Sequence, residues 1–125
     1  SIGKNQTLKI SKNFITIENK KNWERIEGAL IDVVEASNGT AKNIFNKKIR
    51  IAGKTGTAQV KSINEEEYEL VRENEAFRDH ALFVGYGPVE EPALAVVAIV
   101  ENGESGSAVA APLVRSAIDY YIESQ

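Results

Sequence analysis

The sequence contains no cysteine and only one histidine, His80, among its 125 residues. A chain without cysteine forms no disulfide and has no thiolate that could bind zinc. One histidine cannot hold a metal ion without further ligands, so we expect no metal site. The missing cysteine does not locate the protein, because both the cytosol and an export compartment contain proteins without disulfides.

Long apolar runs and an excess of one charge are also missing. No run approaches the ~20 apolar residues of a membrane-spanning helix, and the chain does not open with a signal peptide. The 15 lysine and arginine residues nearly balance the 18 aspartate and glutamate residues, which argues against nucleic acid or an anionic membrane as a partner. At this length the chain forms one domain at most.

The stretch over 48–60 is the most informative part of the sequence. Ile49 and Ile51 alternate with Arg50, as in a half-buried strand. Small residues around one lysine then follow, in the order Gly53-Lys-Thr-Gly-Thr-Ala58. Glycine inside a strand often marks the close approach of a ligand or of another backbone. The lysine supplies a positive charge and the threonines supply hydroxyl donors, so this strand edge suits an anionic acyl substrate.

Lys54-Thr-Gly56 is one of three short motifs that penicillin-binding proteins share with serine β-lactamases. Three further blocks follow it in order, at 78–88, 96–103 and 110–115. Together they resemble the C-terminal part of the transpeptidase domain of class B penicillin-binding proteins. Within that family the similarity is greatest to penicillin-binding protein 2, the transpeptidase of bacterial elongation, and it runs from about residue 23 to residue 121.

Apolar spacing and turn residues predict an α/β fold of the α+β type. The resemblance implies that the strands form a three-stranded antiparallel sheet, covered by an N-terminal helix and a C-terminal helix. The resemblance identifies this sheet as part of the larger sheet of penicillin-binding proteins and β-lactamases. The expected elements are an irregular arm over 1–20, a helix over 22–37, the K-T-G strand over 48–60, a variable loop over 61–79, a hairpin over 81–101 and a helix over 107–123.

The first helix has an expected beginning and end. Asn22 is the expected N-cap, and Asn38-Gly39 is expected to stop the helix because this pair tolerates left-handed backbone. Its apolar residues recur at helical spacing and form one stripe that needs a partner surface. The stripe contains Trp23, Ile26, Leu30, Val33 and Val34.

The last third of the chain gives further local expectations. The strand over 93–100 is apolar at every position, which predicts that both of its faces are covered. Pro112 is expected in the first turn of the last helix, with Tyr121 in the core and Tyr120 at its rim. Gly103-Glu-Ser-Gly-Ser107 nearly matches a nucleophile elbow, but we interpret it as a helix-capping turn because its final glycine is missing.

The resemblance implies a role for each residue of the strand motif. Lys54 would contact the carboxylate of the substrate or antibiotic and the hydroxyl network of the site. Thr57 would provide one oxyanion-hole donor through its backbone N–H. The hydroxyls of Thr55 and Thr57, which alternation places on one side, would provide carboxylate and hydroxyl contacts, and Gly56 would permit close approach. Three more residues are expected near the substrate, with His80 in a structural or substrate-proximal role: Ala58, Gln59 and His80.

The resemblance also implies the activity of a longer parent protein. Such a D,D-transpeptidase attacks the D-Ala-D-Ala bond of a peptidoglycan stem peptide, forms a serine acyl-enzyme and passes the acyl group to an amine. β-Lactam antibiotics are caught at the first step, and no cofactor takes part. The nucleophile, the anchor on the periplasmic face of the bacterial inner membrane and contacts with a membrane glycan polymerase would lie upstream of this chain.

Two short matches imitate the motifs that are missing. Ser1-Ile-Gly-Lys4 has the form S-x-x-K, and Ser11-Lys-Asn13 has the form S-x-N. We reject both, because a nucleophilic serine must begin a buried helix whose lysine faces it in a dry site. Ser1 stands instead in a polar stretch that contains glycine. We therefore expect no nucleophile in this chain and no catalysis by the chain alone.

Two other functions for this chain stay open, and a dimer of the chain is expected. A sensor-type module could bind β-lactam or peptide carboxylates with the same strand and no serine, and a fragment of a serine β-lactamase would share the motif. Thr57-Ala-Gln59 and Arg78-Asp-His80 look more like a penicillin-binding protein. The strand over 93–100 would have a free apolar edge, which predicts an edge-strand dimer of the fragment.

Overall fold

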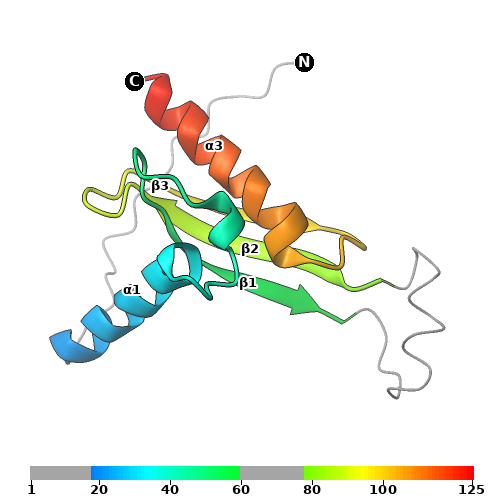
Figure 1. Ribbon diagram of the computed structural model, residues 1–125, viewed down its shortest axis with the longest axis horizontal. Helices are drawn as coiled ribbons and strands as arrows, with labels where there is room; N and C mark the ends of the chain where they lie inside the picture. The colour runs from blue at the N-terminus through cyan, green and yellow to red at the C-terminus, as the bar shows by residue number, and fades with distance from the viewer. Residues whose placement is uncertain (1–17, 60–77) are drawn as a thin grey trace, which may run out of the picture.

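The computed structural model describes residues 18–59 and 78–125, and it confirms the predicted α+β fold (Figure 1). Three antiparallel strands form one sheet in the order β1-β2-β3. The strands are β1 (Ala52–Ala58), β2 (His80–Gly87) and β3 (Leu94–Val100). The helical elements are α1 (Lys20–Glu35), the 3₁₀ turn η1 (Lys42–Ile44), the π turn η3 (Gly106–Ala110) and α3 (Ala111–Glu123). Residues 1–17 of the expected arm and residues 61–77 of the expected loop lie outside the described residues.

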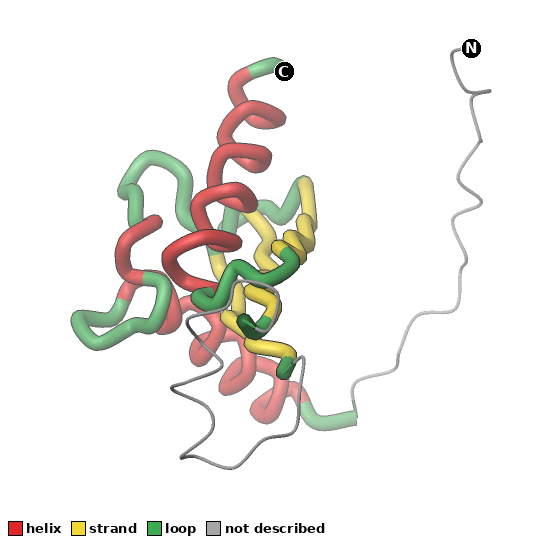
Figure 2. The backbone as a smooth tube through the Cα atoms, turned by 90° about the vertical axis from the view of Figure 1, so that its right-hand side faces the viewer, coloured by secondary structure: helices red, strands yellow, loops and turns green. Residues whose placement is uncertain are grey.

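The two long helices occupy different places beside the sheet. Figures 1 and 2 show α3 running along one face of the sheet, where it contacts β2 and β3, whereas α1 lies beside β1. Neither helix is long and apolar enough to cross a membrane, and the same holds for every other helix in the described ranges.

Helix α1 is displaced by two residues from its predicted range. Its N-cap is Asn19, whose side chain accepts a hydrogen bond from Lys21 N at 3.0 Å, so the prediction of Asn22 was wrong. The helix ends at Glu35, and neither Asn38 nor Gly39 has the expected left-handed backbone. Glycine is required at position 39 for a steric reason instead. A Cβ atom there would lie 2.5 Å from the carbonyl oxygens of Asp32 and Val33, against which the chain folds back.

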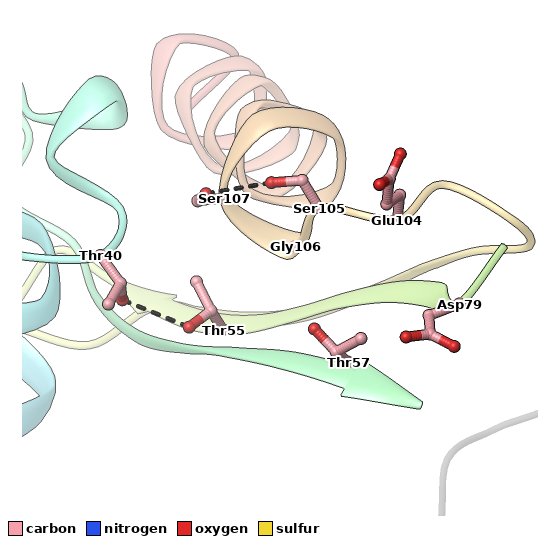
Figure 3. A pocket seen from close by; sticks show the side chains of 8 residues that line it. All are labelled: Thr40, Thr55, Thr57, Asp79, Glu104, Ser105, Gly106 and Ser107. Carbon is pink, nitrogen blue, oxygen red and sulfur yellow. Dashed lines mark hydrogen bonds between the residues drawn. The ribbon is translucent and has the colours of Figure 1, made fainter. Parts of the chain in front are cut away.

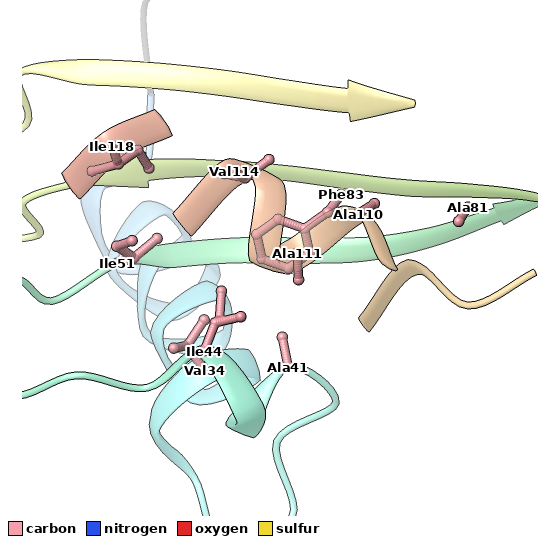
Figure 4. Packing of buried hydrophobic residues seen from close by; sticks show 10 residues of the cluster. All are labelled: Val34, Ala41, Ile44, Ile51, Ala81, Phe83, Ala110, Ala111, Val114 and Ile118. Atoms are coloured by element: carbon pink, nitrogen blue, oxygen red, sulfur yellow. The ribbon is translucent and has the colours of Figure 1, made fainter. Parts of the chain in front are cut away.

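One face of the sheet carries the core and is called the core face. Phe83 of β2 is fully buried, and its ring packs over Gly53 and Gly85, which face each other on β1 and β2. A Cβ on Gly53 would lie 2.6 Å from the Phe83 ring, so glycine makes room for the aromatic side chain. The remaining core residues come from α1, η1, β2, η3, α3 and the positions just before η1 and β1: Val34, Ala41, Ile44, Ile51, Ala81, Ala110, Ala111, Val114 and Ile118 (Figure 4).

The opposite face of the sheet, called the open face, carries Lys54, Val84, Val97 and Ile99. Val97 and Ile99 are each 63% exposed, so the prediction that both faces of β3 are covered was wrong within this chain. The physical reason is that α3 covers only the core face and α1 contacts β1 rather than β3. Two of the five residues of the α1 stripe are also exposed, Trp23 at 48% and Ile26 at 53%.

The C-terminal helix ends where predicted, but the first residues of its predicted range belong to the π turn η3, and one tyrosine differs from its prediction. Pro112 stands at the start of α3 as expected, and Ser105 caps the preceding π turn by accepting a hydrogen bond from Ala108 N at 3.2 Å. The interpretation of this stretch as a capping turn is thereby confirmed. Tyr120 is exposed as expected, but Tyr121 is 37% exposed and does not belong to the core.

Two arginines hold the segment before β1, which makes the strand shorter than predicted. Arg50 forms ion pairs with Glu35 at 2.7 Å and with Glu90 at 2.5 Å, and these hydrogen bonds raise the pKa of Arg50. Arg115 of α3 is 8% exposed, pairs with Asp119 and donates from Nη1 to the Ile49 carbonyl at 2.6 Å. The backbone at 49–50 is therefore engaged by side chains and by the β2–β3 turn, so the ladder starts at residue 52.

Candidate active site

The K-T-G residues lie on an outer strand of the sheet. Within the described residues β1 pairs only with β2, so its second edge is open to an added strand. The register places Lys54 opposite Val84 and Thr55 opposite Phe83. Because side chains alternate along a strand, Lys54 and Gly56 belong to the open face, whereas Thr55 and Thr57 belong to the core face. The side chain of Lys54 and the hydroxyls of Thr55 and Thr57 therefore lie on opposite faces of the sheet, beside the same unpaired edge of β1.

Lys54 is exposed, and its Nζ donates to the carbonyl of Thr55 at 2.6 Å. None of the salt bridges between described residues involves this lysine. Gly56 lies beside it on the same face, where an added Cβ would come within 3.3 Å of the Cβ of Leu82, which is a tight contact. A side chain at position 56 would therefore require a small shift of Leu82 on β2.

A pocket of about 580 Å³ opens on the hydroxyl side of β1 (Figure 3). Both threonines of the motif line it, as alternation along the strand predicts, and Thr55 Oγ1 lies 3.2 Å from Thr40 Oγ1. The opposite wall is the turn between β3 and α3, where Ser105 Oγ and Ser107 Oγ are 3.2 Å apart. The lining residues are Thr40, Thr55, Thr57, Asp79, Glu104, Ser105, Gly106 and Ser107.

The pocket also contains residues to which the sequence assigned no role in the site. Asp79 and Glu104 add two carboxylates, and the backbone joins them, because Glu104 N donates to Asp79 O at 2.8 Å. Thr40 comes from the loop after α1, fifteen residues before Thr55. Only the hydroxyl-rich sequence of 104–107 could have drawn attention to that turn. Within the described ranges no group of three or more His, Asp or Glu residues is arranged to hold a metal ion.

His80 is the first residue of β2 and pairs with Ala58 across the sheet. Its Nδ1 accepts a hydrogen bond from Asn102 N at 3.0 Å. Asn102 has a positive φ of 56°, a conformation that asparagine tolerates better than most residues. The histidine thus fixes the turn after β3. Ala58 and Gln59 are exposed at the end of β1, on the side of the molecule where this turn lies.

A tyrosine connects α1 to the sheet near the other end of β1. Tyr86 Oη donates to Glu27 Oε1 at 3.3 Å, and Tyr86 pairs with Ala52 in the register. Burial, followed by the charge of Glu27, raises the pKa of the Tyr86 hydroxyl, so the hydroxyl stays protonated and continues to donate. This contact and the Arg50 pairs hold β1 at its beginning, while its K-T-G end stays accessible.

The family model of the penicillin binding protein transpeptidase domain matches residues 6–119. The chain belongs to this family. Curated relatives include the peptidoglycan D,D-transpeptidase MrdA of Haemophilus influenzae, 42% identical over 105 residues that make up 82% of this chain and 16% of the relative. Stage V sporulation protein D of Bacillus subtilis is 35% identical over 117 residues, 89% of this chain and 16% of that protein. The chain thus spans about a sixth of the length of the curated relatives it matches.

Solved structures of the family have the same fold. Penicillin-binding protein 2 of Pseudomonas aeruginosa, crystallised in complex with WCK 5153, superposes with a TM-score of 0.70 at 41% identity, over 86% of this chain and 21% of that one. Penicillin-binding protein 2 of Helicobacter pylori, solved in a complex with MreC, gives a TM-score of 0.66 at 30% identity, over 87% and 19%. The resemblance of the sequence to penicillin-binding protein 2 is confirmed by these matches.

Proposed function

We propose that this chain is the C-terminal part of a serine-type peptidoglycan D,D-transpeptidase, to which it contributes the substrate-binding strand. The observation that carries the proposal is the free edge of β1. There Lys54 and the hydroxyls of Thr55 and Thr57 flank Gly56, which adds no side chain of its own to the edge. A stem peptide could lie along this edge as an added strand, with its carboxylate near Lys54.

The proposed reaction divides one acyl transfer into two steps. A serine outside this chain would attack the penultimate D-Ala carbonyl, forming an ester bond while the terminal D-Ala leaves as an amine. A second amine would then attack the ester and restore the serine. Thr57 N–H would donate to the oxyanion at each step, and losing one such donor typically costs about a hundred- to a thousandfold in rate. β-Lactams would stop at the ester.

The parent protein would act at the membrane together with other proteins. The parent would be anchored on the periplasmic face of the bacterial inner membrane by an upstream segment, and it would act with a membrane glycan polymerase through other regions. The exposed apolar side chains of the open face support a longer parent protein, because another part of that protein could pack against them.

Intact-mass spectrometry after incubation with excess benzylpenicillin tests the proposal. The full-length protein should gain the mass of one penicillin, because a serine outside this chain is acylated. The chain of 125 residues should gain nothing, since it holds half of the site and no activated serine. A stoichiometric adduct on the chain itself would overturn the assignment of the nucleophile. An unmodified full-length protein would overturn the transpeptidase proposal and favour a binding module.

The chain alone is expected to form a dimer through β3. Within the described residues β3 has one unpaired edge, it contains no charged residue, and Val97 and Ile99 stand exposed beside that edge. Such edges pair with one another unless a charge blocks them. Light scattering at high concentration should give twice the monomer mass. Ile99→Lys should restore the monomer, whereas Tyr120→Lys, which removes an exposed apolar side chain from α3, should not. A wild-type chain that stays monomeric would contradict the expectation.

A further inference from the structure

Gly106 stands where the turn before α3 touches the K-T-G strand. A Cβ atom on Gly106 would collide with the carbonyl oxygen of Leu82 and lie 2.8 Å from that of Gly56. Leu82 and Gly56 are directly paired on β2 and β1, so Gly106 rests on the backbone of one residue pair. Both obstructing atoms belong to the backbone and cannot rotate away as a side chain would. Only glycine fits at this point without moving the strand or the turn.

The turn that carries Gly106 is fastened from several sides. The Gly106 carbonyl accepts from Ala111 N in the π turn, and Ala108 N donates to Ser105 Oγ at 3.2 Å. From outside the turn, Asn43 Nδ2 donates to the Ser107 carbonyl at 2.8 Å. Single π turns inside helices are frequent at functional sites. Because the turn is held, an added methyl group would displace β1, an outer strand whose ladder partner within the described residues is β2 alone.

We propose that Gly106 is a positioning residue, which sets the place of the Gly56–Thr57 backbone at the free edge of β1. The link from this position to catalysis rests on the proposed function, in which the Thr57 N–H donates to the oxyanion. Gly56 and Thr57 are the residues that a displaced turn would push, because Gly106 contacts Gly56 from the core face. The effect would concern the alignment of the reacting carbonyl more than the capture of the substrate carboxylate by Lys54.

Other glycines provide matched controls for a glycine-to-alanine change. Gly28 lies on α1 and has nothing within 4 Å of an added Cβ, so Gly28→Ala adds the same methyl group without a contact. Gly53 is also crowded, but by Val84 O and the Phe83 ring at the beginning of β1. Gly53→Ala therefore reports what crowding of the core does to stability when it occurs away from the Gly56–Thr57 edge.

The test measures penicillin acylation and strand position in Gly106→Ala, Gly28→Ala and Gly53→Ala. In the full-length protein, the dissociation constant of the first complex and the acylation rate constant are determined separately with a fluorescent penicillin. Gly106→Ala should lower the rate constant at least about tenfold and change the dissociation constant less, because a displacement of about 1 Å at the reacting atoms can cost about a hundredfold. Gly28→Ala should match the wild type. In the ¹⁵N-labelled chain, Gly106→Ala should shift the amide signals of Gly56 and Thr57.

Each result decides for or against the positioning role. A folded Gly106→Ala protein acylated at the wild-type rate overturns it. The role is also overturned if Gly106→Ala weakens binding and slows acylation equally and lowers the melting temperature as much as Gly53→Ala does. Such a result would indicate a merely structural glycine. If Gly106→Ala does not fold, Asn43→Ala removes the hydrogen bond to Ser107 from an exposed side chain, and a lowered rate constant at unchanged melting temperature supports the role, whereas an unchanged rate constant overturns it. If the wild type is not acylated, the proposed function fails, and the amide shifts alone decide whether Gly106 positions the strand.

Discussion

Replacing Lys54 by methionine should lower penicillin acylation of the full-length protein about a hundredfold. Methionine keeps the unbranched length of the side chain and removes the charge and the three donors. A hydrogen bond to a charged group contributes about 1.5–3 kcal/mol, which corresponds to roughly ten- to a hundredfold. We expect the upper end because Lys54 would serve both the substrate carboxylate and the hydroxyl network. The quantity to measure is the second-order rate constant of acylation.

Lys47→Met is the matched control for this experiment. Lys47 is an exposed lysine in the loop before β1, so its replacement removes the same charge seven residues away from the motif. A wild-type rate in this variant would show that net charge is not the cause. If Lys54→Met is acylated as fast as the wild type, the lysine does not contact the antibiotic. If both variants slow equally, a long-range field explains the loss and the local role fails.

Local patterns predicted the sheet and the last helix well, because their determinants are neighbours in the sequence. The turn at 88–92 lies between two apolar runs, and the structure places β2 and β3 on either side of it in antiparallel pairing. At the start of the last helix, the Ser105 side chain accepts a hydrogen bond from a backbone N–H that has no partner inside the helix, and Pro112 has no N–H that would need one. The strand around Lys54 was predicted from its alternation, although its ladder starts four residues later than expected.

The errors arose where distant residues decide the outcome. Asn19 and Asn22 are equally good caps by residue type, and nothing local distinguishes them. The apolar run of β3 suits a covered strand, yet no helix among residues 18–59 and 78–125 covers the open face. Arg115 gave no sign of burial, because its partner Ile49 O is 66 residues away.

The candidate site was predicted on one strand only. Alternation correctly placed Thr55 and Thr57 on one side, but it could not show that the opposite wall is the turn at 104–107. That wall forms because Gly106 packs on Gly56 and Leu82, a contact that depends on the absence of a side chain. A missing Cβ leaves no periodic signal in a sequence, since glycine is equally expected in any turn.

Replacing Phe83 by alanine should cost about 3–5 kcal/mol of the free energy of unfolding. The side chain is fully buried, and two glycines give its ring a site that few other residues could fill. Removing a buried aromatic ring forfeits its transfer free energy and leaves a cavity, and a domain has only about 5–15 kcal/mol in total. Urea denaturation of the chain, followed by circular dichroism, measures the loss. Phe83→Ala should therefore unfold at a much lower urea concentration than the wild type.

The control for Phe83→Ala is Val97→Ala on the open face, which should change the free energy of unfolding by less than about 0.5 kcal/mol in a monomeric sample. A Phe83 variant that loses less than about 1 kcal/mol would mean that the ring does not fill the space over Gly53 and Gly85. Phe83 is also the register partner of Thr55, so its removal takes away packing directly beside the motif. The amide signal of Thr55 should then shift in the folded variant, whereas Val97→Ala should leave it in place. The same ring would in that case support both the stability of the chain and the position of the strand that binds substrate.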